Sequence, residues 1–215
     1  MTLRRLAARL AGLLIPLLSG GAALAEGPAK PQAGATARSG IPYKPDSDAA
    51  GPAELVKAIR ARRAGGKLLN LDRMLLHSPS FAKGWNGMFG AIRNELSLPP
   101  RLRELAIMAI GRLNKADYEW GQHEGEFLKT GGTREQLAAL SDVPAAIKDA
   151  RLFDEAQRAT LALTGEMTRN IAVSAATMQR VRAALPDDQV VELIGTIAGY
   201  NMVSRFVVAT GVDME

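Results

Sequence analysis

The stretch from Arg101 to Gly132 restricts the fold more than any other part of this sequence. It reads RLRELAIMAIGRLNKADYEWGQHEGEFLKTGG, and its apolar residues recur at helical spacing on both sides of Asn114. We predict two helices joined by a short turn near Asn114, with this asparagine as the N-cap residue of the second helix. Because the connection is short, the two helices are expected to pack as an antiparallel pair.

The first helix of this pair is predicted to be buried on nearly every side. It follows Pro99 and Pro100, and proline is tolerated in the first turn of a helix. Its apolar positions are Leu102, Leu105, Ala106, Ile107, Met108, Ala109, Ile110 and Leu113. Glu104 is the exception. Since burial disfavours a charged carboxylate, we expect this side chain either to pair with another group or to have a raised pKa.

The second helix carries a histidine on its apolar face. That face is formed by Ala116, Trp120, His123 and Phe127. Glu119 precedes His123 by four positions, so the two side chains are within reach of each other on a helix. We predict that Glu119 orients the imidazole and raises its basicity. Glu104, Glu119 and His123 would then meet between the two helices as a catalytic acid–base group.

A purely structural interpretation of the same residues stays open at this stage. A glutamate in the first turn of a helix stabilises the helix dipole, and a buried histidine is often only a hydrogen-bonded core residue. The spacing E-x-x-x-H is also common on helices. The pattern alone therefore does not decide between a catalytic and a structural role for Glu104 and His123.

The stretch resembles the carboxymuconolactone decarboxylase family, which includes the alkylhydroperoxidase-D-like proteins. The similar motifs are R-x-R-E-L-A-I, Y-E-W-x-x-H and F-L-K-T-G-G-T-R-E-Q-L, which begin at Arg101, Tyr118 and Phe127. Weaker similarity continues in P-D-D-Q-V-V-E-L-I-G and Y-N-M-V-S-R-F towards the end of the sequence. The resemblance implies an all-α, compact multi-helix domain over residues 52–215, built around the central antiparallel pair. It also implies a homo-oligomer, either a trimer or a hexamer.

Peroxidases of this family carry C-x-x-C followed by x-x-x-H, with a glutamate on the preceding helix that completes a proton relay. The histidine of that pattern falls on His123 and the glutamate on Glu104, whereas the two cysteine positions fall on Ala116 and Glu119. The sequence contains no cysteine. The resemblance therefore implies the cysteine-free decarboxylase branch, in which an acid–base pair acts without a cofactor.

Further residues are expected to bind the substrate. These candidates are Tyr118, Trp120, Arg101, Asn201 and Arg205. The two aromatic residues would form a wall of the pocket, and one of the arginines would hold a substrate carboxylate as a fork. Asn201 lies one turn before Arg205 on an otherwise apolar helix, so its amide needs a partner and is expected to line the pocket. The alternative for Arg205 is an ion pair with Glu192 or a subunit contact.

The first 25 residues are typical of a secretory signal peptide, with an arginine-rich start and an apolar run too short to span a bilayer. The sequence Ala23-Leu24-Ala25 provides a cleavage site, so we expect an exported protein, periplasmic or secreted, that is cleaved after Ala25. An uncleaved anchor is the alternative. Residues 26–51 are rich in Pro, Gly, Ala and Ser and are predicted to be a flexible lead segment.

Composition argues against several other classes of partner. The formal net charge of +5 would fall to about +2 after cleavage, because the peptide removes three arginines and no acidic residue. Without a basic stripe that includes aromatic residues, no nucleic-acid partner is expected. Glu192, Asn201 and Arg205 argue against a membrane span in the last apolar helix. One histidine beside two glutamates is a weak ligand set, so no metal is expected, and the family resemblance implies no cofactor.

These observations lead to hypotheses from different functional classes. The first is a decarboxylase acting on a small carboxylated lactone or a related acid, with His123 as proton donor or shuttle and Glu104 completing the relay. The second is a non-catalytic periplasmic binding or structural protein on the same scaffold, because breakdown of aromatic acids is usually cytoplasmic and this chain looks exported. Peroxidase-like activity is a third hypothesis, and it requires a cysteine that the sequence lacks.

Overall fold

The computed structural model describes residues 37–215, and over that range it consists of helices and connecting loops without a β-strand. The predicted all-α fold class is therefore confirmed. The predicted signal peptide and the first part of the lead segment lie outside the described residues.

Ten α-helices and three short 3-10 helices make up the described chain. The α-helices are α1 (Ala53–Ala61), α2 (Asn70–Leu75), α3 (Pro79–Asn94), α4 (Pro100–Leu113), α5 (Asp117–Lys129), α6 (Arg134–Ala139), α7 (Val143–Ala146), α8 (Glu155–Asn170), α9 (Ala175–Ala184) and α10 (Asp187–Thr210). The 3-10 helices are η1 (Asp48–Ala50), η2 (Ala64–Gly66) and η3 (Leu140–Asp142).

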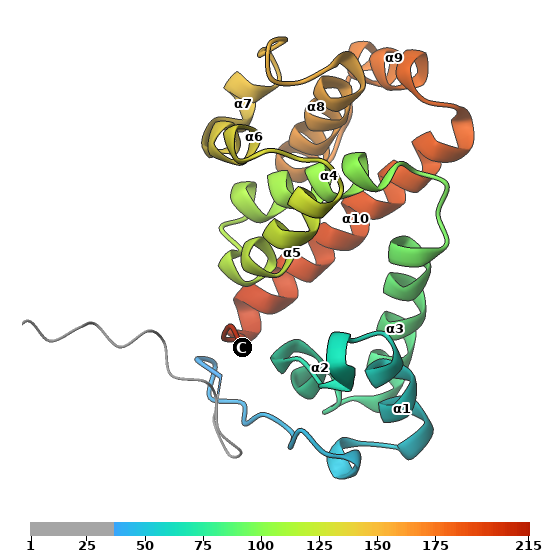
Figure 1. Ribbon diagram of the computed structural model, residues 1–215, viewed down its shortest axis with the longest axis vertical. Coiled ribbons are helices and arrows are strands. Elements are labelled where there is room, and N and C mark those ends of the chain that lie inside the picture. Colours follow the sequence, from blue (N-terminus) through green and yellow to red (C-terminus); the bar gives the residue numbers. More distant parts are fainter. Residues whose placement is uncertain (1–36) are drawn as a thin grey trace, which may run out of the picture.

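The long helix α10 runs obliquely through the molecule and connects its two ends (Figure 1). Helices α1, α2 and α3 form a group at one end, α6 to α9 lie at the other, and α4 and α5 lie between the two groups beside α10. Helix α4 packs against α5, α8 and α10. As a result all residues from Leu105 to Ile110 are 0% exposed, which confirms that this helix is buried on nearly every side.

Local sequence signals set several helix boundaries. Thr133 and Gln136 form a capping box at α6, in which the Thr133 hydroxyl accepts from the Gln136 N–H at 3.1 Å. Before it, α5 ends near Gly131, whose φ of +93° suits a glycine. Proline occupies the first turn of both α3 and α4.

One boundary differs from the prediction. Helix α5 begins at Asp117 rather than at Asn114, which is instead the C-cap residue of α4. The N-cap residue of α5 is Ala116, and the Asn114 amide donates to Asn201 Oδ1 at 3.0 Å. Helix α8 begins after Asp154, which forms a capping box with Gln157.

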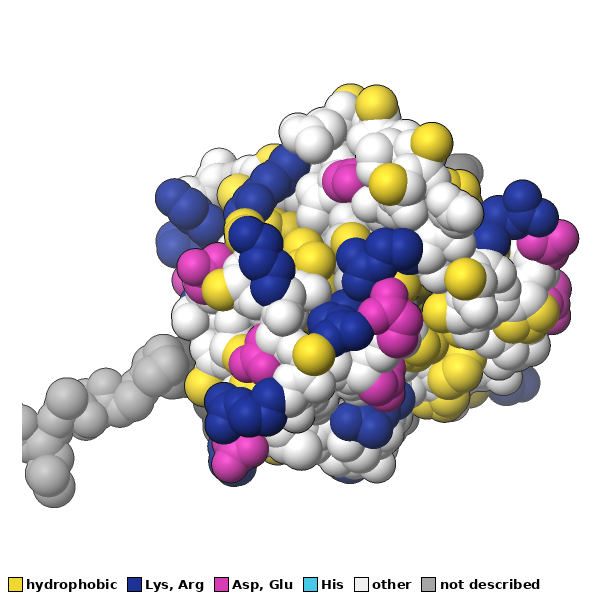
Figure 2. Space-filling view, turned by 90° about the horizontal axis from the view of Figure 1, so that it is seen from above, with side chains coloured by type: hydrophobic (Ala, Val, Ile, Leu, Met, Phe, Trp, Pro, Cys, Tyr) yellow, Lys and Arg dark blue, Asp and Glu magenta, His cyan; other side chains and the backbone are white. Residues whose placement is uncertain are grey.

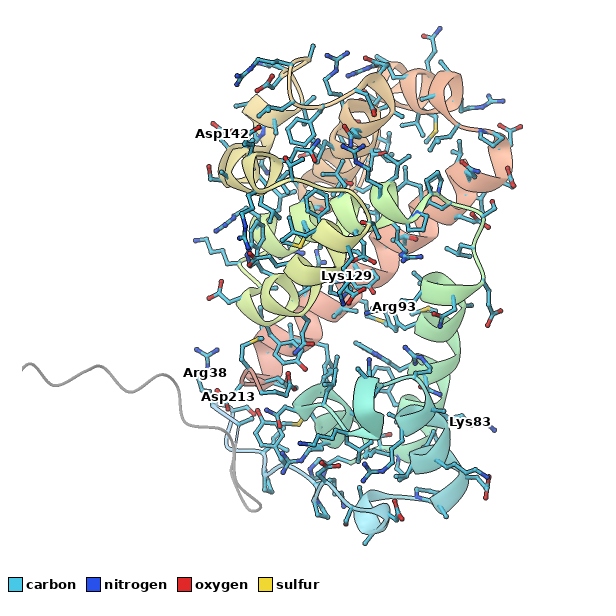
Figure 3. The ribbon with its side chains drawn as sticks, viewed as in Figure 1. Arg38, Lys83, Arg93, Lys129, Asp142 and Asp213 are labelled. Atoms are coloured by element: carbon cyan, nitrogen blue, oxygen red, sulfur yellow. The ribbon has the colours of Figure 1, made fainter. Side chains whose placement is uncertain are left out.

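Residues 37–51 belong to the expected flexible segment, yet in the structure they are packed against the rest of the protein. The buried residues among them are Ala37, Tyr43 and Ala50. The Tyr43 hydroxyl donates to Asp213 Oδ2 at 3.1 Å and accepts from the Asp213 N–H at 2.8 Å. Figure 3 shows Arg38 beside Asp213 in the same region. These contacts attach the start of the described chain to its end.

The surface in Figure 2 carries basic and acidic side chains mixed together. None of the helices within residues 37–215 combines the length and the apolar character that a membrane crossing requires.

Candidate active site

The centre of the site is a hydrogen-bonded pair of side chains, Glu104 from α4 and His123 from α5. His123 Nδ1 lies 2.7 Å from Glu104 Oε2, and the two residues are only 5% and 1% exposed. The second carboxylate oxygen of Glu104, Oε1, accepts from Arg103 Nε at 3.1 Å. The predicted meeting of Glu104 and His123 is therefore present, with both glutamate oxygens hydrogen-bonded.

The surroundings of this pair set its protonation state. Burial by itself would raise the pKa of Glu104, but the hydrogen bond and charge of His123, with the charges of Arg103 and Arg93, hold the pKa below its usual value. Burial lowers the pKa of His123. At neutral pH we therefore assign an ionised Glu104 that accepts from the Nδ1–H of a neutral imidazole. This tautomer leaves a lone pair on His123 Nε2.

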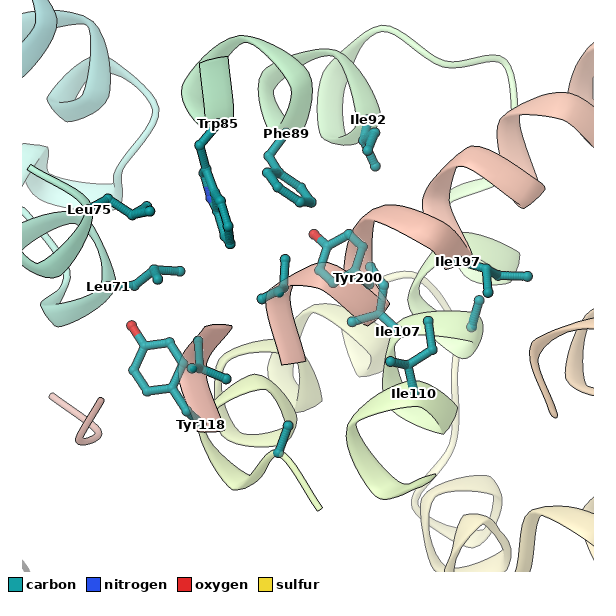
Figure 4. Close-up of a cluster of buried hydrophobic side chains, with 14 of the residues drawn as sticks. Leu71, Leu75, Trp85, Phe89, Ile92, Ile107, Ile110, Tyr118, Ile197 and Tyr200 are labelled. Carbon is teal, nitrogen blue, oxygen red and sulfur yellow. The ribbon is translucent and has the colours of Figure 1, made fainter. Parts of the chain in front are cut away.

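A cavity of about 220 Å³ lies beside His123. It is lined by Arg62, Arg63, Ala64, Leu69, Leu71, Trp85, Phe89, Arg93, Tyr118, Glu119, Gln122, His123, Glu126, Tyr200 and Val203. Figure 4 shows Trp85 and Phe89 projecting from α3 towards Tyr200 of α10, with Leu71 and Tyr118 nearby. The His123 and Tyr200 rings meet edge to face, with their centroids 5.1 Å apart. The cavity thus has an apolar, largely aromatic wall on one side of the imidazole.

Three arginines add positive charge to the cavity wall. Arg63 is paired with Asp72 through hydrogen bonds of 2.6 and 2.8 Å. Arg62 donates to the carbonyl and side-chain oxygens of Asn86. Arg93 extends from α3 towards α5 (Figure 3) and forms no ion pair within the described chain. Two of the three positive charges are therefore unneutralised by an acidic partner, which favours an anionic ligand.

Two acidic residues also line the cavity. Glu126 forms an ion pair with Lys129 at 2.7 Å. Glu119 is 2% exposed, and its Oε2 accepts from Ser204 Oγ at 2.8 Å. Burial, opposed in part by this hydrogen bond, raises the pKa of Glu119 to about 8. The prediction that Glu119 orients His123 is wrong, because Glu104 occupies Nδ1 and Glu119 bonds to α10.

Of the predicted substrate-binding residues, only Tyr118 lines the cavity. Trp120 packs beneath the Arg112 guanidinium, 4.2 Å from its ring centroid, and Arg101 also lies outside the cavity wall. Their predicted roles are therefore not supported by the geometry. Position on the helix explains this for Trp120, since it is about 100° away from Glu119 around α5.

Asn201 and Arg205 also lie away from the cavity. The Asn201 amide donates to Thr168 Oγ1 and to the Ile197 carbonyl, each at 3.0 Å. Arg205 is exposed and donates to the Asn201 carbonyl at 2.9 Å. The Tyr200 side chain lines the cavity. Asn201 follows it and is rotated by about 100° around α10, so its amide faces Thr168 instead.

Several cavity residues were not predicted from the sequence. They are Arg62, Arg93, Gln122 and Tyr200, together with Ser204 behind Glu119. Two of them had a visible signal: Tyr200 and Ser204 belong to the Y-N-M-V-S-R-F motif, but periodicity did not show which of its residues face the site. Arg62 is the C-cap residue of α1 and Arg93 lies in α3, and nothing in the local pattern separates them from surface arginines.

Neither the second histidine nor a cluster of metal ligands contributes to the cavity in the described chain. His77 is exposed, and its Nε2 lies 2.7 Å from the Pro42 carbonyl oxygen, so it attaches the segment before α1 and does not reach the cavity. Within residues 37–215, no three His, Asp or Glu side chains are grouped as ligands for a metal ion.

The fold and the site together define an all-α protein in which a buried Glu–His pair on two packed helices faces a small cationic cavity. Residues 79–164, which include both members of the pair, match the Carboxymuconolactone decarboxylase family. This match confirms the resemblance recognised from the sequence. The comparison with curated proteins gives no match.

Several solved structures share this fold. An uncharacterized peroxidase-related protein from Silicibacter sp. TM1040 is 18% identical, covers 88% of this chain and 96% of its own, and has a TM-score of 0.69. An alkylhydroperoxidase AhpD core protein from Ralstonia eutropha JMP134 is 17% identical over 80% and 90%, with a TM-score of 0.67. A variant of the debrominase Bmp8 in complex with 2,3,4-tribromopyrrole is 18% identical over 75% and 84%, with a TM-score of 0.62. At this identity the likeness shows the fold.

Proposed function

We propose that this protein is a cofactor-free acid–base enzyme that decarboxylates, or transfers a proton within, a small carboxylated lactone or a related organic acid. The observation that carries the proposal is the 2.7 Å contact between Glu104 and His123, which leaves His123 Nε2 available at a cationic cavity. A histidine with an adjacent buried carboxylate is a recurrent general acid–base group. The match to the decarboxylase family supports the same reaction class.

The size and charge of the cavity suit a small organic anion. Pockets for drug-sized ligands have volumes of roughly 300–1,000 Å³, so a cavity of about 220 Å³ suits a smaller molecule. Arg93 and Arg62 would attract its carboxylate, and the aromatic wall formed by Trp85, Phe89 and Tyr200 would contact a flat ring.

The chemistry follows from the protonation states. When the bond between the substrate carbon and its carboxylate breaks, carbon dioxide leaves and the electron pair passes into the conjugated lactone as a dienolate. That dienolate must then take up one proton at carbon. His123 Nε2 can accept a proton from one ligand atom and deliver it to another, because ionised Glu104 stabilises the imidazolium that forms in between.

The test is turnover by purified protein with carboxymuconolactone and related lactone acids, followed by substrate absorbance and released carbon dioxide. We expect turnover in the wild type and a loss of about 10²- to 10⁴-fold in kcat for both His123→Gln and Glu104→Gln. Circular dichroism would establish that both variants are folded. If both variants are as active as the wild type, Glu104 and His123 are excluded as the catalytic group.

A wild type that turns over none of these acids would instead favour a non-catalytic periplasmic binding protein on the same scaffold. We also propose that the protein is exported after cleavage behind Ala25 and assembles as a trimer or hexamer. N-terminal sequencing of the protein from its native compartment and its sedimentation in solution test these two proposals independently of catalysis.

A further inference from the structure

The acid–base pair does not account for Glu119, the most isolated acidic side chain at the cavity. Ser204 is its only side-chain hydrogen-bond partner within the described residues, and its second oxygen, Oε1, is buried without a partner. No basic side chain there forms an ion pair with it, in contrast to Glu104 and Glu126. An ionised carboxylate in this position would be an uncompensated buried charge, which is strongly unfavourable.

A neutral carboxylic acid fits the same position. The Ser204 hydroxyl donates to Oε2, which identifies Oε2 as the carbonyl oxygen of the acid and leaves Oε1 as the O–H group. That O–H lacks an acceptor in the described chain, while Glu119 itself lines the cavity. The Ser204 hydrogen bond fixes the orientation of the carboxyl group, so Oε1 is the oxygen left for a ligand in the cavity that Glu119 lines.

We propose that Glu119 is a second catalytic residue, a neutral carboxylic acid that donates a proton to the bound substrate, and that Ser204 is the positioning residue that orients it. This inference rests on the proposed function and deepens it, because it assigns the proton donor for the same cavity. Neutral His123, one turn further along α5, is the base that would accept a proton where the reaction is a proton transfer within the ligand. Two titratable groups held in opposite protonation states are the usual requirement for paired acid and base catalysis.

Cleavage of the carbon–carboxylate bond releases carbon dioxide and leaves its electron pair on the dienolate. The bond between Glu119 Oε1 and its hydrogen breaks, that proton forms the new C–H bond, and Glu119 becomes a carboxylate. A proton from the solvent then returns Glu119 to its neutral form, so each decarboxylation consumes one solvent proton. No oxidant or reductant is needed.

Several charged or titratable groups surround Glu119. Those that share its cavity are His123 and Glu126 on α5, Arg93 on α3, Tyr200 on α10, Tyr118, Arg62 and Arg63, and Glu104 lies behind His123. Burial and the Ser204 hydrogen bond are nevertheless the two influences that determine the pKa of Glu119. A substitution of Ser204 is therefore expected to change the pKa of Glu119.

Infrared spectroscopy tests the protonation state without any substrate. At pH 6 the wild type should show the carbonyl stretch of a protonated carboxylic acid, which should be absent in Glu119→Gln and retained in the matched variant Glu104→Gln. Ser204→Ala should shift the frequency of this band, and Ser204→Thr, which keeps the hydroxyl, should restore it. A spectrum in which Glu119 absorbs only as a carboxylate at pH 6 would overturn the inference.

Kinetics test the donor role. Glu119→Gln should lower kcat by about 10²- to 10⁴-fold with little change in KM, because glutamine keeps the shape and the hydrogen bond but cannot transfer a proton. Ser204→Ala should move the alkaline limb of the kcat profile, and Ser204→Thr should return it. A Glu119→Gln enzyme as active as the wild type would refute the donor role alone, whereas a wild type without turnover would refute the proposed function.

Discussion

Glu104 Oε2 and His123 Nδ1 lie 2.7 Å apart, although the two residues come from different helices and are both almost completely buried. Because α4 is enclosed by α5, α8 and α10, neither side chain can exchange this partner for water. A buried carboxylate that accepts from the imidazole in this way fixes its tautomer and the direction of its free nitrogen.

The first prediction concerns the charge of Glu104. Glu104→Gln keeps the shape but removes the anion that stabilises the imidazolium, so the pKa of His123 should fall further and kcat should fall by about 10²-fold or more. The protein has only two histidines, so the NMR signals of His123 can be assigned and followed with pH. Glu124→Gln, next to His123 in sequence but outside the cavity wall, should leave the His123 titration unchanged.

The second prediction concerns Arg93. Its guanidinium lines the cavity without an acidic partner in the described chain, so Arg93→Gln should raise KM for an anionic substrate by about 10-fold, equivalent to about 1.4 kcal/mol. The effect should shrink at high salt if it is electrostatic. Arg205→Gln removes the same charge from an exposed position on α10. A KM increase for Arg205→Gln equal to that for Arg93→Gln would contradict the placement of Arg205 away from the ligand.

Much of the helical framework was predictable from local sequence. The apolar runs of α4 and α10 give their lengths, and Thr133 with Gln136 marks the start of α6. The meeting of Glu104 with His123 was also predictable, because a short turn between two amphipathic helices brings their buried polar residues face to face.

The remainder depends on contacts between residues far apart in sequence. Asn114 looks like an N-cap residue, but its amide is used by Asn201 on α10. Likewise, Arg93 enters the cavity only because α3 packs across α10, a relationship that periodicity does not contain. The sequence also does not give the rotation of a buried helix about its axis. Tyr200 and Asn201 are adjacent on α10, yet one faces the cavity and the other faces away.

The third prediction uses the raised pKa of Glu119, about 8 in the folded protein. An unfolded glutamate ionises near pH 4.5, so between about pH 5 and 8 the folded state holds a proton that the unfolded state has lost. Stability contributed by this group is therefore lost as the pH rises through that window. Relative to the wild type, Glu119→Gln should gain on the order of 3 kcal/mol of unfolding free energy between pH 5 and pH 8.

Urea unfolding of both proteins at a series of pH values measures this difference. The comparison with Glu119→Gln cancels the other titrating groups, including Glu104, whose lowered pKa acts in the opposite direction and removes stability only in acid. A stability difference that stays constant from pH 5 to pH 8 would show that Glu119 ionises normally.

The fourth prediction separates structure from catalysis at Asn201. Its side chain is buried and hydrogen-bonded to Asn114, Thr168 and the Ile197 carbonyl. Asn201→Ala leaves the Asn114 and Thr168 groups without this partner, so the unfolding free energy should fall by about 1–3 kcal/mol. Because Asn201 lies outside the cavity wall, kcat and KM of the folded variant should equal those of the wild type. Thermal unfolding and steady-state kinetics on the same preparation check both parts.

The last prediction concerns Gly131 and Gly132, which end α5. Gly131 has a positive φ of +93° but open space around it, so Gly131→Ala should cost about 1–2 kcal/mol through backbone strain. A Cβ on Gly132 would lie 2.2 Å from Cε1 of Phe127, a ring that is 0% exposed and has no room to move. Gly132→Ala should therefore destabilise the protein more, by about 3 kcal/mol.

Phe127 lies one turn after His123 on α5, so displacement of its ring should also disturb the cavity. Gly132→Ala should reduce activity below its melting temperature, whereas Gly131→Ala should not. Denaturant unfolding with near-ultraviolet circular dichroism measures the stability order and the packing of the aromatic side chains. If Gly131→Ala proves the more harmful of the two, backbone conformation rather than the Phe127 contact determines how α5 ends.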